Sequence, residues 1–160
     1  MDSSIFLLLG TNLGDREQNL AKAKELILAQ VGTITRQSST YQTAAWGKTD
    51  QPDFYNEVIA IDTALAPEAL LQATLGIEEQ MGRRRTEVWG TRVIDIDILL
   101  YHDCIVATTN LTIPHPAMAQ RRFTLIPLAE IAADIVHPIY KKTIRELLEH
   151  CEDQLPVIKR

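Results

Sequence analysis

Two aspartates interrupt a run of isoleucines in the segment RVIDIDILLYH, residues 92–102. The alternation is typical of a β-strand, and it places Asp95 and Asp97 on one face and the isoleucines on the other. The two aspartate Cα atoms then lie roughly 7 Å apart, and both carboxylates point the same way. This pattern fits a strand with a solvated face, and it also fits a site for a divalent metal ion.

Arginines cluster directly before this strand, in the segment GRRRTEVWGTR, residues 82–92. The guanidinium groups of Arg83, Arg84, Arg85 and Arg92 are suited to bind phosphate oxygens in bidentate fashion. An arginine run alone is usually a solvated surface. Next to two carboxylates on one face, it supplies the parts of a phosphoryl-transfer site, in which carboxylates and phosphates hold magnesium. We therefore expect a magnesium-dependent phosphotransferase site here.

The elements that must position this site follow the order β-α-β-β-α-β. Alternating or continuous apolar runs predict strands at residues 4–10, 33–43, 54–65 and 92–102, and helical spacing predicts helices at residues 15–31 and 67–81. This order predicts an α+β fold with a ferredoxin-like β-α-β-β-α-β core and an antiparallel sheet. The C-terminal additions are a short strand pair near residues 104–113 and helices near residues 125–133 and 143–151.

Composition limits the class of protein. With 160 residues, 46% hydrophobic and 23% charged, the chain is expected to form one globular domain spanning residues 1–160. It has no apolar stretch long enough to cross a bilayer and no signal-peptide pattern, so we expect a cytoplasmic protein with no membrane contact. A net charge of −5 argues against nucleic acid as a partner, although it allows a local basic pocket. A monomer is the default expectation.

Two other classes of protein share the expected element order. An RNA-binding domain would carry base-stacking aromatics on its central strands and a basic sheet face, whereas this strand presents aspartates. A small-molecule regulatory domain would not need paired carboxylates next to clustered arginines. A different magnesium-dependent phosphotransferase or nucleotidyltransferase is the nearest alternative, because metal and phosphate groups do not determine which phosphorus is attacked.

Several blocks of the sequence resemble one family across nearly the whole chain. They are FLLLGTNLGDRE, YQTAAWGKTDQPDFYNEV, IEEQMGRRRTEVWGTRVIDIDILLY, LTIPHPAM and RRFTLIPLAEI. In this order and spacing, the chain resembles the hydroxymethyldihydropterin pyrophosphokinases of folate biosynthesis. The resemblance implies a compact α+β fold. It also implies transfer of the β,γ-diphosphate of ATP to the hydroxymethyl group of 6-hydroxymethyl-7,8-dihydropterin, with release of AMP.

The resemblance implies roles for individual residues at the ATP side. Asp95 and Asp97 correspond to ligands of two Mg2+ ions, and the catalytic positions correspond to Arg83, Arg92 and Asp97. The implied ATP contacts are Glu78, Arg83, Arg85, Arg92, Ile98, Leu111, Thr112, His115 and Arg121. Near adenine, at Ile98, Leu111 and Thr112, we expect backbone contacts to dominate. Arg92 is the implied contact to the transferring group. No general base is obvious, although Asp97 could accept the hydroxyl proton.

The pterin side follows from the same resemblance. The implied contacts are Thr43, Ala44, Ala45, Trp46, Phe54, Asn56, Trp89 and Phe123. Phe54 and Phe123 correspond to a pair of rings that sandwich the flat heterocycle, and stacking supplies contact area and orientation together. Asn56 corresponds to a hydrogen-bonding amide, and Trp89 to a residue of a lid that closes over the site.

The chain departs from the usual family pattern in the lid and the pterin loop. Val88 stands where many members carry arginine, and Thr91 where many carry proline. In the pterin loop, Ala45 replaces a proline, and Trp46 is larger than the usual aliphatic residue. We therefore expect this chain to differ in lid closure and loop rigidity, although none of the four positions supplies a metal ligand.

Overall fold

The computed structural model describes residues 4–44, 52–82 and 93–160. Its strands are β1 (Ile5–Thr11), β2 (Gly32–Gln37), β3 (Tyr41–Thr43), β4 (Phe54–Thr63), β5 (Asp95–Tyr101), β6 (Val106–Ala107), β7 (Thr112–Ile113) and β8 (Ile158–Lys159). Its helices are α1 (Arg16–Gln30), α2 (Pro67–Gln80), α3 (Arg122–Ala132) and α4 (Ile144–Glu149), with a 3-10 turn at Met118–Gln120. Within these ranges, no helix is long and apolar enough to cross a membrane.

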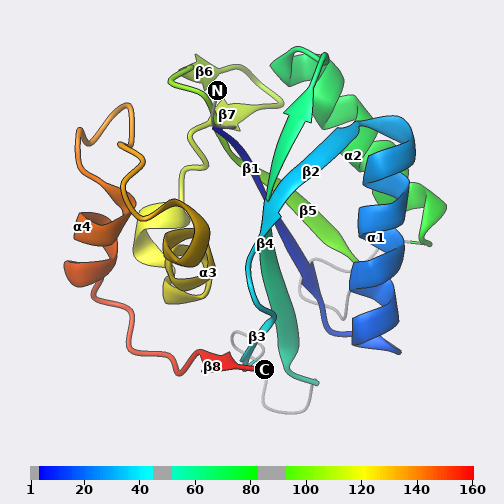
Figure 1. Cartoon of the computed structure of the whole chain (residues 1–160), viewed down its shortest axis with the longest axis horizontal. Coiled ribbons are helices and arrows are strands. Elements are labelled where there is room, and N and C mark those ends of the chain that lie inside the picture. The colour runs from blue at the N-terminus through cyan, green and yellow to red at the C-terminus, as the bar shows by residue number, and fades with distance from the viewer. Residues whose placement is uncertain (1–3, 45–51, 83–92) are drawn as a thin grey trace.

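The main sheet has the strand order β5-β1-β4-β3-β8, and β2 also pairs with β4 (Figure 1). Its pairings are antiparallel. The order β5-β1-β4-β2 with two helical crossovers is the ferredoxin-like arrangement, so the predicted α+β fold is confirmed. The predicted additions are also present, since β6 pairs with β7 and α3 and α4 follow.

Helices cover both faces of this sheet: α1 and α2 lie on one side, and α3 and α4 on the other (Figure 1). Successive residues of β1 point to opposite faces, which divides the core into two parts. Leu7 and Leu9 pack in the cluster that includes Ile27 of α1, and Leu8 packs with Leu125 of α3. β1 is therefore buried on both sides, as expected of a central strand covered on both faces.

The single strand predicted for residues 33–43 is interrupted at residues 38–40, so that prediction needs correction. Gln37 lies opposite Ile59 and Tyr41 lies opposite Asn56, which sets four residue steps on one strand against three on β4. One extra residue of this kind forms a bulge and divides the strand into β2 and β3. The short strand β8, which pairs with β3, was not predicted either.

Candidate active site

Three residues on neighbouring strands form a row across the sheet. Gly10 of β1 lies opposite Asp95 of β5 on one side and opposite Asn56 of β4 on the other. Directly opposite residues of antiparallel strands point to the same face, so all three lie on the face that α3 covers. A side chain at Gly10 would crowd this row, because its Cβ would lie 3.1 Å from the Asn56 Oδ1 and 3.9 Å from a ring carbon of Phe54.

The two aspartates lie on one face of β5 and the isoleucines on the other, as the alternation in the sequence predicted. Asp95 and Asp97 are half-buried, while Ile96 and Ile98 between and after them are buried on the opposite face with α1 and α2. Within the described ranges, no group of three or more His, Cys, Asp and Glu side chains could hold a metal ion by itself. A pair of carboxylates still fits Mg2+, which is usually held by one or two carboxylates together with substrate phosphates and water.

His115 and Arg121 lie near this pair. The His115 backbone N–H donates to the Leu99 carbonyl of β5 at 3.0 Å, and its ring Nδ1 accepts the Ala117 N–H at 3.2 Å. Burial lowers the pKa of His115; the Asp97 carboxylate opposes this shift and the Arg121 guanidinium adds to it. His115 is thus within electrostatic reach of both Asp97 and Arg121. A neutral His115 with Nδ1 as acceptor carries its proton on Nε2, where it can be donated.

Glu78 of α2 is hydrogen-bonded to β5, the strand that carries the two aspartates. It is only 3% exposed, and its Oε2 accepts the backbone N–H of Ile96, the residue between the two aspartates, at 2.7 Å. Among the described residues, β5 is an edge strand of the sheet, so this contact satisfies a backbone donor that no described strand pairs with. The observed role of Glu78 is therefore to position β5, and its contact with the nucleotide stays a prediction.

Two of the predicted pterin residues, Asn56 of β4 and Thr43 of β3, lie at the other end of the row. The Asn56 Nδ2 donates to the Thr43 Oγ1 of β3 at 2.9 Å, and both side chains are buried. Phe54 begins β4 and Phe123 lies in the first turn of α3, and both are partly buried. The Arg121 guanidinium carbon lies 5.5 Å from the centre of the Phe123 ring, within cation–π range. Ala44 follows at the surface.

The residues predicted near adenine lie farther along β5 and on the β6–β7 hairpin. Ile98 and Leu111 are buried in the core cluster under α1 and α2, and Thr112 is exposed. Two of the three side chains thus serve the core, and backbone contacts with adenine stay a prediction.

Several site residues escaped the sequence analysis. The sequence placed Gly10 only at the end of the first predicted strand, because nothing in its spacing reveals that it lies between Asn56 and Asp95. Asn12 donates from Nδ2 to the Pro52 carbonyl at 3.2 Å, and Arg16 donates to the Asp53 carbonyl at 2.7 Å. These two contacts hold the segment that leads into Phe54, and no short-range pattern signals them.

Six predicted site residues lie outside the described residues: Arg83, Arg85 and Arg92 at the ATP side, and Ala45, Trp46 and Trp89 at the pterin side. Val88 and Thr91 lie outside as well. The lid, two of the three catalytic assignments and part of the pterin loop therefore stay predictions from the sequence.

Same-face carboxylates beside a histidine and an arginine, on an antiparallel α+β fold, are suited to an enzyme that acts on anionic substrates. Comparison with known proteins is more specific. The sequence model of the HPPK family, described as 7,8-dihydro-6-hydroxymethylpterin-pyrophosphokinase, matches residues 6–133. The chain belongs to this family. The prediction of an ATP-dependent pyrophosphokinase of folate biosynthesis is thereby confirmed.

Curated relatives of similar length support this assignment. The chain is 46% identical over 144 residues to a 2-amino-4-hydroxy-6-hydroxymethyldihydropteridine pyrophosphokinase of Methylorubrum extorquens, covering 89% of this chain and 90% of the relative. It is 40% identical over 144 residues to the protein of the same name from Aquifex aeolicus, covering 90% of this chain and 89% of the relative.

Solved structures show the same fold at lower identity. A crystal structure of Plasmodium falciparum HPPK-DHPS, a triple mutant, aligns with a TM-score of 0.76 at 20% identity over 92% of this chain. The A437G form of that protein aligns with a TM-score of 0.76 at 19% identity over 92% of this chain. The chain spans 44% and 45% of those two longer chains.

Proposed function

We propose that this chain transfers the β,γ-diphosphate of ATP to the hydroxymethyl group of 6-hydroxymethyl-7,8-dihydropterin, and that the reaction takes place over the row Asp95, Gly10 and Asn56. The row carries the proposal because it places a carboxylate and an amide on one face with a residue lacking a side chain between them. The amide suits the edge of a pterin, and the carboxylate suits a metal bound to phosphates.

Asp95 and Asp97 would hold Mg2+, and the family resemblance favours two ions. Bound magnesium would neutralise part of the triphosphate charge. The half-burial of both aspartates supports this role, because carboxylates that lie partly out of water interact more strongly with a cation than exposed ones. ATP is the co-substrate that the family membership supports.

The chain's own groups would orient the two substrates. His115 donates from Nε2 and Arg121 donates from its guanidinium group to phosphate oxygens, and the predicted contacts of Arg83, Arg85 and Arg92 add positive charge. On the pterin side, Asn56 has a second N–H and a carbonyl oxygen beyond the N–H that it donates to Thr43. Phe54 and Phe123 supply rings for stacking. Asp97 is the candidate acceptor for the hydroxyl proton.

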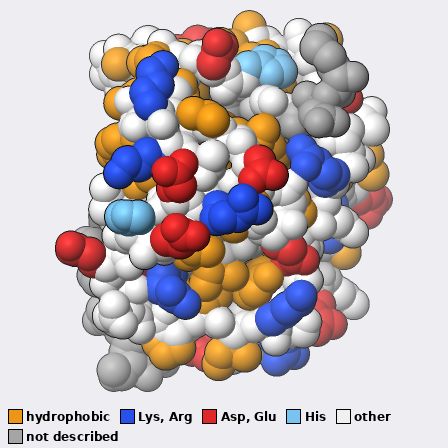
Figure 2. Space-filling view, turned by 60° about the vertical axis from the view of Figure 1, so that its left-hand side comes forward, with side chains coloured by type: hydrophobic (Ala, Val, Ile, Leu, Met, Phe, Trp, Pro, Cys, Tyr) orange, Lys and Arg blue, Asp and Glu red, His pale blue; other side chains and the backbone are white. Residues whose placement is uncertain are grey.

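The charge distribution agrees with small-molecule substrates. The face turned forward in Figure 2 mixes basic and acidic side chains, whereas a surface that binds nucleic acid carries mainly basic groups. We further propose that the enzyme acts as a cytoplasmic monomer with one domain over residues 1–160. Sedimentation velocity tests the monomer, since a concentration-dependent shift would contradict it.

The test of the reaction is a product assay with ATP, Mg2+ and 6-hydroxymethyl-7,8-dihydropterin. We expect one AMP and one pterin diphosphate for each ATP consumed, and no AMP without the pterin. ADP or free pyrophosphate as the stoichiometric product would contradict the proposal and favour another phosphotransferase. Binding of both ligands without turnover would instead favour the regulatory domain.

A further inference from the structure

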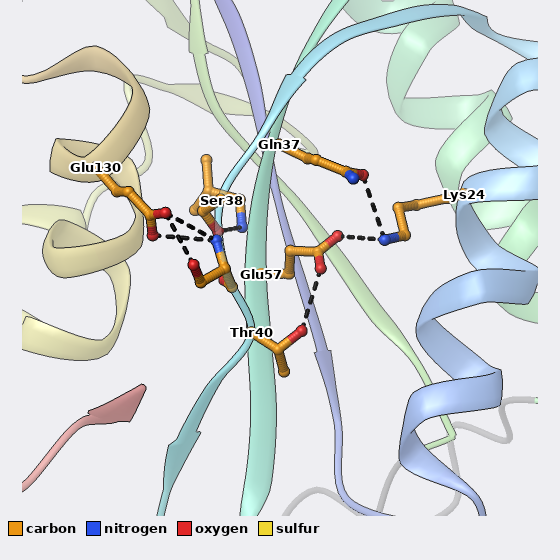
Figure 3. Close-up of polar contacts among 8 residues, drawn as sticks. Lys24, Gln37, Ser38, Thr40, Glu57 and Glu130 are labelled. Atoms are coloured by element: carbon orange, nitrogen blue, oxygen red, sulfur yellow. Dashed lines mark hydrogen bonds and ion pairs between the residues drawn. The ribbon is translucent and has the colours of Figure 1, made fainter. Parts of the chain in front are cut away.

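Polar contacts on both faces of the sheet hold the junction between β2 and β3, residues 38–40 (Figure 3). From the α3 side, the Glu130 carboxylate accepts hydrogen bonds from the Ser39 backbone N–H at 3.0 Å and from the Ser39 hydroxyl at 2.9 Å. From the α1 side, Glu57 accepts a hydrogen bond from the Thr40 hydroxyl at 3.2 Å. This junction leads directly into β3.

The contact from α3 continues into β3 itself. The Tyr41 hydroxyl donates to the Glu130 Oε1 at 2.6 Å. Burial raises the pKa of Glu130, but hydrogen bonds from Tyr41 and Ser39 outweigh it and hold that pKa below its usual value. Burial and the Glu130 carboxylate raise the pKa of Tyr41 to about 12. Glu130 is therefore an ionised acceptor with three donors, and hydrogen bonds of this charged kind are the stronger ones.

Glu130 connects two parts of the proposed pterin site. It lies seven residues after Phe123 on α3, which is close to two helical turns, so both side chains lie on the same side of the helix. Tyr41 lies opposite Asn56, and Thr43 on the same face of β3 accepts the hydrogen bond of the Asn56 amide. One carboxylate thus ties the helix that carries Phe123 to the strands that carry Asn56 and Thr43.

We infer that Glu130 is a positioning residue for the pterin: through Ser39 and Tyr41 it sets the separation between Phe123 and the Asn56–Thr43 pair. The inference rests on the proposed function. A flat ring held between an aromatic face and an amide needs its supports placed within about 0.5 Å. On the ATP side, Asp95 and Asp97 lie on β5, and His115 is hydrogen-bonded to β5. Loss of the Glu130 contact therefore affects pterin binding more than ATP binding.

The test compares Glu130→Ala, Glu130→Gln and Tyr41→Phe with the wild type. Dissociation constants for the pterin and for a non-hydrolysable ATP analogue are measured separately by calorimetry, together with thermal denaturation. We expect Glu130→Ala to weaken pterin binding about tenfold, in line with the cost of small displacements in a binding site, and to change ATP-analogue binding less than about twofold. Glu130→Gln and Tyr41→Phe keep part of the contact, so we expect smaller losses of the same kind.

Asp134→Ala is the matched control. It removes a 2.7 Å ion pair between an exposed carboxylate and Arg145, also on the α3–α4 side of the molecule, and should leave both dissociation constants unchanged. Equal weakening of both ligands in the Glu130 variants, or wild-type pterin binding in any folded Glu130 variant, would overturn the inference. If Glu130→Ala does not fold, Tyr41→Phe decides, and unchanged pterin binding there overturns it. A wild type that binds pterin but releases no AMP would contradict only the proposed function.

Discussion

Asp95 of β5 and Asn56 of β4 lie on opposite sides of the same residue, Gly10 of β1. Neighbouring strands are about 4.8 Å apart, so roughly 10 Å separates the backbones that carry the carboxylate and the amide. This spacing suits a site in which a metal-bound phosphate approaches from one side and a pterin is held on the other. The missing side chain at Gly10 leaves room for the Asn56 amide, whose Oδ1 a Cβ at this position would meet at 3.1 Å.

Gly10→Ala should therefore impair pterin binding first. The added Cβ would lie 3.1 Å from the Asn56 Oδ1, a contact tight enough to displace the amide or strain its hydrogen bond to Thr43. We expect the KM for the pterin to rise several-fold while the KM for ATP changes little. Gly76→Ala is the control, because its added Cβ would meet only a glutamine side chain at 4.0 Å. Equal kinetics in the two variants would contradict a role for Gly10.

Asp95→Asn and Asp97→Asn each keep the side-chain shape and remove one anionic ligand. We expect kcat to fall more than about 100-fold, since losses next to a metal site already cost 10–100-fold when they affect only its outer contacts. The fold should persist with equal or slightly greater stability, because two same-face carboxylates repel each other without metal. Calorimetry of Mg2+ binding with an ATP analogue gives an independent measurement. Wild-type turnover in either variant would favour the solvated-face interpretation.

His137 should make stability depend on pH. The ring is 2% exposed, its Nδ1 accepts the N–H groups of Ile139 and Tyr140, and burial lowers its pKa. Because the folded-state pKa lies below the unfolded value of about 6.5, the unfolded chain takes up protons first. Stability is then fully present above about pH 6.5 and falls as the pH drops toward the folded-state pKa.

The variant His137→Asn keeps an acceptor but does not titrate, so urea midpoints of the two proteins at pH 7.5 and pH 5.5 isolate this contribution. The wild type should lose more stability between these pH values than the variant does. His115 contributes a shift of the same sign in both proteins and cancels in the comparison. Identical pH dependence of the two proteins would show that His137 does not contribute.

The ion pair between Lys24 and Glu57 should matter more than surface pairs. The Lys24 Nζ lies 2.7 Å from Glu57, whose side chain is 5% exposed (Figure 3). Lys22 and Glu25, in contrast, form a 3.8 Å pair at the surface. Lys24→Met leaves a buried charge without its cation and should cost roughly 3 kcal/mol of unfolding free energy. Lys22→Met should cost less than about 0.5 kcal/mol.

Adding Glu57→Gln to Lys24→Met removes the unpaired charge and should restore most of the lost stability, which urea denaturation would measure as a favourable coupling between the two sites. Additive losses would contradict the pairing. A Lys24→Met cost no larger than that of Lys22→Met would contradict it as well.

The sequence was a good guide wherever a local pattern determines the structure. Alternation in residues 92–102 placed Asp95 and Asp97 on one face, and that face is the one observed. Helical spacing and capping signals also work over short distances: Asp15 caps α1 and Pro67 begins α2, as predicted.

The features that the sequence did not reveal depend on contacts between distant segments. At the break at residues 38–40, the Val58 N–H, 20 residues away, donates to the Ser38 hydroxyl, and the Ser39 N–H donates to Glu130, 91 residues away. β8 is only two residues long and pairs with the edge of β3, so it is too short for a periodic pattern to predict it. Gly10 acquires its place in the site only when β4 and β5 pair on its two sides.

Asn56 and Glu57 are adjacent in β4, and their partners lie on opposite faces of the sheet: Thr43 of β3 for Asn56 on the α3 face, and Lys24 of α1 for Glu57 on the other. β1, the strand alongside, is apolar on both faces and would tolerate a shift of one residue against β4. A shift of β4 by one residue would turn Glu57 toward α3, away from Lys24. The buried charge would then be unpaired, which costs about 3–5 kcal/mol. These two polar neighbours therefore discriminate the native strand alignment from misaligned sheets that hydrophobic burial alone would accept.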